Sequence, residues 1–73
     1  MMVKPGDRIQ VKPSKYITPG FRTKLWMENE KGTVLKINNK TITVEFDNYP
    51  GEKHYIDYGD FDIIKECDQD DTE

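Results

Sequence analysis

Apolar and polar side chains alternate along short stretches of this chain, and turn-forming residues separate the stretches. The clearest alternation covers residues 41–46, where residues with high strand propensity follow one another. It predicts a strand with a buried face of Ile42, Val44 and Phe46 and an exposed face of Thr41, Thr43 and Glu45. This period of two is the main reason to expect a β protein.

Four further stretches have a similar character, at residues 7–12, 33–37, 53–57 and 62–65. Tight turns are expected at residues 38–40, because asparagine tolerates positive φ, and at Pro50-Gly51, which suits a type II turn. Residues 58–61 form a short connector. From Val34 to Ile37 the apolar spacing is three instead of two, which predicts a bend or bulge in the second strand.

The segment from residue 13 to residue 31 has no dominant pattern and is longer than an ordinary connection. Phe21 and Leu25 stand four residues apart and could share one face of a short helix, whereas residues 24–27 could equally form a short strand. We expect Leu25 and Phe21 to fold back over a small core. For Trp26, capping the core and facing solvent are equally supported, and Tyr16 is the aromatic residue that we expect to be exposed.

The length of 73 residues allows a single domain, which we place at residues 1–65. A chain of this size buries only about 60% of the surface that its unfolded form exposes, so its core is thin and a deep cofactor pocket is not expected. Apolar residues make up 34% of the chain, and no apolar run exceeds three residues. We therefore expect neither a membrane span nor a secretory signal, and we expect a cytoplasmic location.

Charge divides the chain into two unlike parts. Residues 66–73 contain five acidic and no basic residues, and we expect them to form a disordered acidic tail. Residues 1–65 carry 11 basic and 9 acidic residues, and between Lys4 and Lys24 six basic residues accompany the single acidic Asp7. Cys67 lies within these acidic residues, where an exposed free thiol is expected.

Residues for catalysis are sparse. His54 is the single histidine, and its alternation with Ile56 predicts a partly buried strand residue instead of a catalytic base. Asp57, Asp60 and Asp62 could approach a cation, but clustered surface carboxylates are usually only hydrated. We expect no enzyme activity, no cofactor and no metal site.

The order Gly6-Asp7, Ile9, Val11, then residues 32–37 (Gly-Thr-Val-Leu-Lys-Ile), then residues 44–47 (Val-Glu-Phe-Asp) resembles SH3-like barrels of the KOW type. The run Pro13-Ser14-Lys15-Tyr16 followed later by Gly32-Thr33-Val34 is similar to the SH3-like docking subunits of photosynthetic electron-transfer complexes, such as the one in photosystem I. The first loop is longer than in either family, and the basic Gly-rich loop of KOW domains is absent. These resemblances imply a single five-stranded SH3-like barrel with a long first loop.

Cations and aromatic rings interleave in that first loop, a combination that suits either a protein hot spot or nucleic-acid binding. The candidate partner-binding residues are Lys12, Lys15, Tyr16, Arg22, Lys24 and Trp26. The net charge of −3 would oppose binding of a phosphate backbone, so we expect a module that docks on a protein partner. Nucleic-acid binding through residues 12–26 is the alternative, followed by an acidic inhibitor that imitates nucleic acid. The sequence indicates no oligomeric state.

Overall fold

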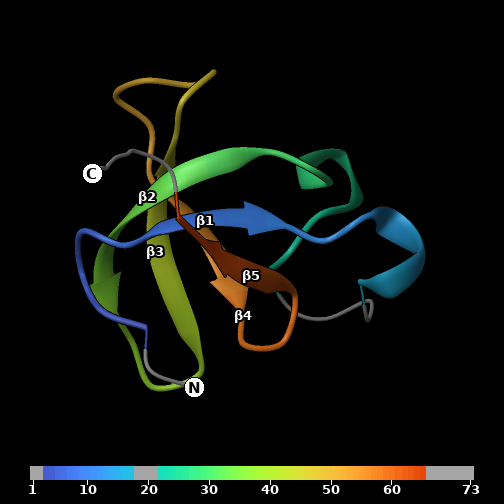
Figure 1. The fold of residues 1–73 in the computed structure, drawn as a ribbon, viewed down its shortest axis with the longest axis horizontal. Coiled ribbons are helices and arrows are strands. Elements are labelled where there is room, and N and C mark those ends of the chain that lie inside the picture. The colour runs from blue at the N-terminus through green and yellow to red at the C-terminus, as the bar shows by residue number, and fades with distance from the viewer. Residues whose placement is uncertain (1–2, 18–21, 66–73) are drawn as a thin grey trace, which may run out of the picture.

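The protein folds into a five-stranded antiparallel sheet with two short 3-10 turns in its first long loop (Figure 1). The computed structural model describes residues 3–17 and 22–65. The elements are β1 (Arg8–Val11), η1 (Ser14–Tyr16), η2 (Leu25–Met27), β2 (Lys31–Ile37), β3 (Thr41–Phe46), β4 (His54–Asp57) and β5 (Phe61–Ile64). The all-β class is confirmed, and β3 has the bounds that its alternation predicts.

The strand order is β4-β3-β2-β1-β5, so the last strand pairs with the first. Arg8 lies opposite Ile64 and Val11 lies opposite Phe61 in this pairing. In Figure 1, β2 is the long curved strand that contributes to both halves of the sheet. Among the described strands, β4 and β5 are the two edges and do not pair with each other, so the sheet is not closed.

The predicted irregularity of β2 is confirmed at Leu35. Val34 pairs with Val44 and Lys36 pairs with Thr43, so Leu35 is an extra residue without an opposite partner. A bulge of this kind bends a strand and increases its twist. It therefore explains why the spacing of apolar residues changes from two to three between Val34 and Ile37.

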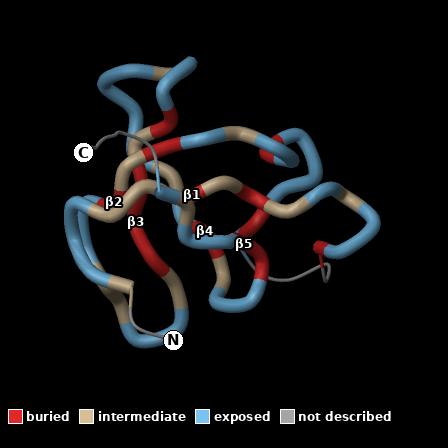
Figure 2. The backbone as a smooth tube through the Cα atoms, viewed as in Figure 1, coloured by how far each residue is buried: buried red, intermediate tan, exposed pale blue. Residues whose placement is uncertain are grey.

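The core lies between the inward faces of the curved sheet, as the red segments of Figure 2 show. Its buried apolar residues are Ile9, Val11, Ile17, Met27, Val34, Ile42, Val44, Phe46, Ile56 and Phe61. The three residues on the predicted inward face of β3 are all fully buried. Gly32 makes close packing possible at the centre, because a Cβ atom there would lie 2.7 Å from the Glu45 carbonyl oxygen.

The long loop differs from both expected forms. Residues 25–27 make a single 3-10 turn, neither a regular helix nor a strand. Leu25 is 59% exposed, so the prediction that it covers the core was wrong; Met27 is buried in its place. In a tight turn of three residues per repeat, Leu25 and Met27 point in different directions, and only one of them can face the core. Phe21 lies outside the described residues.

The outward face of β3 is also less exposed than its alternation predicts. Thr43 is 5% exposed, and its hydroxyl oxygen accepts a hydrogen bond from the Asn38 side-chain amide at 2.9 Å. Lys36 and Tyr55 are its partners on the two neighbouring strands. The expectation that Thr43 faces solvent was therefore wrong, because long side chains on both sides cover a short one between them.

Both predicted turns are present, one with a different backbone geometry. The chain reverses at residues 38–40, where the Asn38 amide donates to the Thr41 carbonyl at 2.9 Å. Asn29, with φ of 62°, is the one non-glycine residue of the described ranges with positive φ, so the 38–40 turn does not use the left-handed region. Gly51 has φ of 84°, as a type II turn after Pro50 requires.

The described residues contain no helix of the length and apolar character that would cross a membrane. The predicted acidic tail, residues 66–73 with Cys67, lies outside the described residues.

Candidate binding groove between the long loop and β4

The second half of the long loop is held against the end of β4 by hydrogen bonds between Thr23 and Asp57. The Asp57 backbone N–H donates to the Thr23 hydroxyl at 2.8 Å. The Asp57 carboxylate in turn accepts the backbone N–H groups of Arg22, at 3.0 Å, and Thr23, at 3.2 Å. Thr23 is buried by this contact. The anchor fixes Arg22 and Lys24 beside β4, although 30 or more residues separate them in the sequence.

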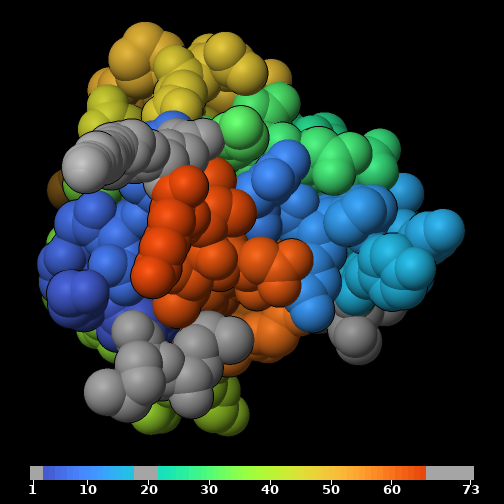
Figure 3. Space-filling view, viewed as in Figure 1, coloured from blue at the N-terminus to red at the C-terminus, as the bar shows by residue number. Residues whose placement is uncertain are grey.

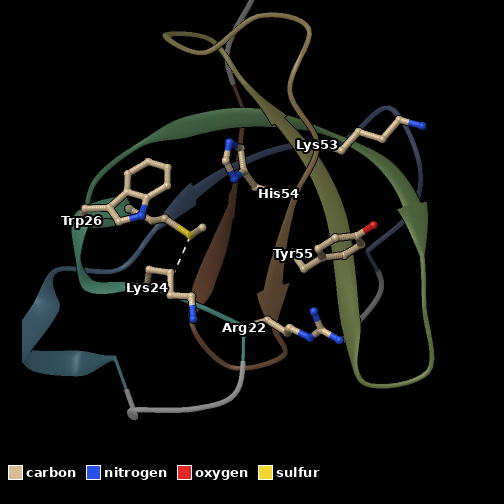
Figure 4. Close-up of a pocket in the computed structure, with 7 residues that line it drawn as sticks. Arg22, Lys24, Trp26, Lys53, His54 and Tyr55 are labelled. Carbon is tan, nitrogen blue, oxygen red and sulfur yellow. Dashed lines mark hydrogen bonds between the residues drawn. The ribbon is translucent and has the colours of Figure 1, made fainter.

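Beyond this anchor, the loop and β4 diverge and leave an open groove of about 440 Å³. The groove is lined by Arg22, Lys24, Trp26, Met27, Lys53, His54 and Tyr55 (Figure 4). In the close-up, His54 extends from β4 toward Trp26, whereas Tyr55 extends to the opposite side of the strand, where Arg22 lies. Successive residues of a strand point to opposite faces, so the groove runs along the edge of β4.

One wall of the groove is a cluster of aromatic rings around Trp26. The indole ring meets the rings of Tyr49 and His54 edge-on, with centroids 5.2 and 5.3 Å apart, and that of Phe46 at 6.1 Å. Such edge-to-face contacts hold a ring in one orientation. Trp26 nevertheless keeps 47% of its surface exposed. Both alternatives considered for this residue are therefore present: it covers the core and also faces solvent.

The other wall is formed by Tyr55 and Arg22. The guanidinium carbon of Arg22 lies 5.6 Å from the centroid of the Tyr55 ring, a cation–π distance. Tyr55 is 42% exposed. A second, adjoining hollow shares Lys53 and Tyr55 and continues over the outer face of the sheet to Leu35 and Lys36.

The groove carries positive charge. Arg22, Lys24 and Lys53 are among its lining residues, and no aspartate or glutamate of residues 3–17 and 22–65 is. Two acidic residues adjacent in sequence to this part of β4 have partners of their own, since Asp57 anchors the loop and the Glu52 carboxylate lies 3.0 Å from the His54 Nε2 atom. His54 is a partly buried strand residue, as its alternation predicts. The arrangement favours an anionic ligand with apolar parts.

The structure brings together half of the predicted partner-binding residues. Arg22, Lys24 and Trp26 line the groove. Lys12, Lys15 and Tyr16 are not among its lining residues and belong to the segment around η1, which projects at the side of the molecule in the space-filling view (Figure 3). Tyr16 is 61% exposed, as predicted, and the Lys15 ammonium group lies 5.2 Å from the centroid of its ring.

Sequence reasoning missed the contribution of β4 to this groove. Lys53 and Tyr55 stand two residues apart, with His54 between them. The strand pattern therefore could have placed Lys53 and Tyr55 on one face of the strand and His54 on the other. Their proximity to Arg22 and Lys24 could not, because it depends on the Thr23–Asp57 contact.

The described residues offer no cluster of three or more His, Cys, Asp or Glu side chains that could hold a metal ion. Of the three aspartates considered for a cation or an acidic face, Asp60 is buried, Asp57 bonds to the loop and Asp62 is exposed. Comparisons with protein-family models, with curated proteins and with solved structures find no match to this chain.

Proposed function

We propose that this protein is a small non-enzymatic interaction module with an SH3-like barrel, and that the groove between η2 and β4 docks a segment of a protein partner. The barrel assignment is supported by the pairing of β1 with β5, by the bulge in β2 and by the long loop between β1 and β2. A bulged central strand allows a small sheet to curve around one core.

The exposure of Trp26 and Tyr55 beside Arg22 is the observation that carries this proposal. Tryptophan, tyrosine and arginine are the residue types that most often dominate the free energy of protein–protein binding. Here they flank one groove, and the Trp26 ring is already held by its aromatic neighbours. A pre-ordered ring loses little conformational entropy on binding, which favours affinity.

The charge of the groove defines the partner segment further. Of the residues that the structure describes, three cations and no carboxylate line it, so an acidic segment would be attracted and a basic one repelled. The chain as a whole has a net charge of −3, which repels any polyanion at long range, and a polyphosphate with many charges more than a short peptide with few. We therefore favour a short acidic peptide, whose apolar side chains can also contact the rings of the groove.

The test uses the fluorescence of Trp26, the single tryptophan of the chain. Titration with eight-residue peptides that alternate glutamate with valine, leucine or tyrosine should shift this fluorescence saturably. Lys24→Glu should weaken binding of the best peptide about tenfold or more, because it replaces an attraction with a repulsion. Tyr16→Ala serves as the matched control, since Tyr16 is also an exposed aromatic residue but does not line the groove, and the affinity of this variant should equal that of the wild type.

Two results would overturn the proposal. One is a set of titrations in which no peptide perturbs Trp26. The other is binding of a single-stranded oligothymidylate far below the typical non-specific dissociation constant of about 0.1 mM, with affinity that falls steeply as salt is added. The second result would assign the groove to nucleic acid.

A further inference from the structure

β4 is an edge strand, and the direction of its backbone groups can be read from one hydrogen bond. In an antiparallel pair, successive residues alternate between bonding to the neighbouring strand and pointing away from it. The Asp57 backbone N–H donates to the Thr23 hydroxyl of the long loop, so the backbone N–H and C=O groups of Asp57 point away from β3. Tyr55 lies two residues earlier in β4 and pairs with Thr43 in the same register, so its backbone N–H and C=O groups also point away from β3.

The outward backbone groups of Tyr55 face the groove and meet no partner in residues 3–17 and 22–65. The loop covers the Asp57 end of this edge but diverges before Tyr55. An uncovered N–H and C=O on an edge strand form a template for pairing with another extended chain. This opening lies between the aromatic wall at Trp26 and the Arg22–Tyr55 wall.

We infer that the partner segment docks in an extended conformation and adds a strand to the outer edge of β4 at Tyr55. This inference rests on the proposed function and specifies how the peptide is recognised. Main-chain hydrogen bonds to Tyr55 would supply affinity, and alternate side chains of the peptide would supply specificity.

The two walls fit the alternation of such a strand. Side chains on one face of the added strand would meet Trp26 and His54, and those on the other face would meet Tyr55 and the Arg22 guanidinium. Acidic side chains on the peptide would lie within reach of Lys24 and Lys53, which line opposite ends of the groove's basic rim in Figure 4. Ion pairs of this type would also fix the register of the added strand.

Backbone methylation of the peptide provides the decisive experiment. The best alternating peptide from the fluorescence titrations is compared with a version that is N-methylated at every second residue, once in each of the two registers. Charge and side chains are unchanged, so pure side-chain binding predicts equal affinity for all three peptides. Strand addition predicts that one methylated register binds at least about tenfold more weakly, because its donors toward β4 are removed.

Amide hydrogen exchange by NMR gives an independent readout. The Tyr55 amide should become protected when the unmodified peptide is added, while amides at the edge of β5 should not change, because β5 is an edge strand outside the groove. Tyr55→Pro should weaken binding more than Tyr55→Ala, since proline removes the outward N–H at a position where the β3–β4 ladder does not use it. The methylated peptides remain informative if the proline variant does not fold.

The outcomes separate the two proposals. Saturable binding with no methylation effect and no protection of Tyr55 would overturn strand addition but leave the docking function intact. No binding of any peptide would overturn the docking function itself.

Discussion

At the level of single residues, charge pairs on the surface give this thin fold a defined response to acid. Arg8 forms a two-point ion pair with Asp47, in which the Nη1 atom lies 2.7 Å from the carboxylate, and it also donates to the Thr33 hydroxyl at 3.0 Å. The hydrogen bond from Arg8 lowers the pKa of Asp47 below its ordinary value of 3.8. A pKa lowered by folding contributes stability above pH 3.8 that is lost as the pH falls through the folded-state pKa.

We therefore expect Asp47→Asn to lower the free energy of unfolding at neutral pH by about 0.2 to 1 kcal/mol, the range for exposed pairs. The difference from the wild type should shrink as the pH falls from neutral through the folded-state pKa of Asp47, because the carboxylate then becomes protonated in both states. Urea denaturation of both proteins across this range measures it. A constant difference at every pH would show that the effect is not due to the charge.

Val44 and Thr43, the two central residues of β3, should differ in how much stability the protein loses when each is replaced by aspartate. Val44 is fully buried, so Val44→Asp should abolish cooperative unfolding. Thr43 is 5% exposed on the opposite face, and Thr43→Asp should cost about 1 to 3 kcal/mol, while Thr43→Ser keeps the hydroxyl and should change little. Thermal unfolding followed by circular dichroism ranks the three variants. Wild-type stability of Thr43→Asp would mean that this face is open to water.

At the level of elements, the close packing of β2 against β3 depends on glycine at position 32, which has no side chain. A Cβ atom at Gly32 would lie 2.7 Å from the Glu45 carbonyl oxygen and 3.1 Å from the Phe46 Cα atom, and both are backbone atoms that cannot rotate away. Gly32→Ala should therefore lower the free energy of unfolding by about 1 to 3 kcal/mol. Asn39→Ala, in the exposed turn between the same strands, is the control and should be nearly neutral. Equal denaturation midpoints for both variants would contradict the tight strand contact.

The strands were predictable because their information is local. Alternation over residues 41–46 and the changed spacing after Val34 reflect which face of a single strand is buried, and the structure confirms both. The 3-10 turn at residues 25–27 was not predictable, since short turns have little pattern of their own and this one is set by the burial of Met27.

At the level of the whole molecule, the groove is the part that sequence alone left incomplete. The composition of the first loop indicated Arg22, Lys24 and Trp26, because interleaved cations and aromatic rings suit a binding surface. The opposing wall on β4 follows from a tertiary contact between residues 23 and 57, for which no local pattern exists. Two residues of the same loop, Lys15 and Tyr16, share that composition but lie on a separate projection.

The pairing of β1 with β5 also has a consequence for how the chain folds. Val11 meets Phe61 across this pair, and both are core residues, so the core is incomplete until the two ends of the domain have come together. Closing so long a loop is entropically costly and slows folding, whereas the hairpin of β2 and β3 closes over a few residues. A two-stranded hairpin alone is marginally stable in water, so we expect the β2–β3 pair to persist only once β5 has joined β1 and completed the core.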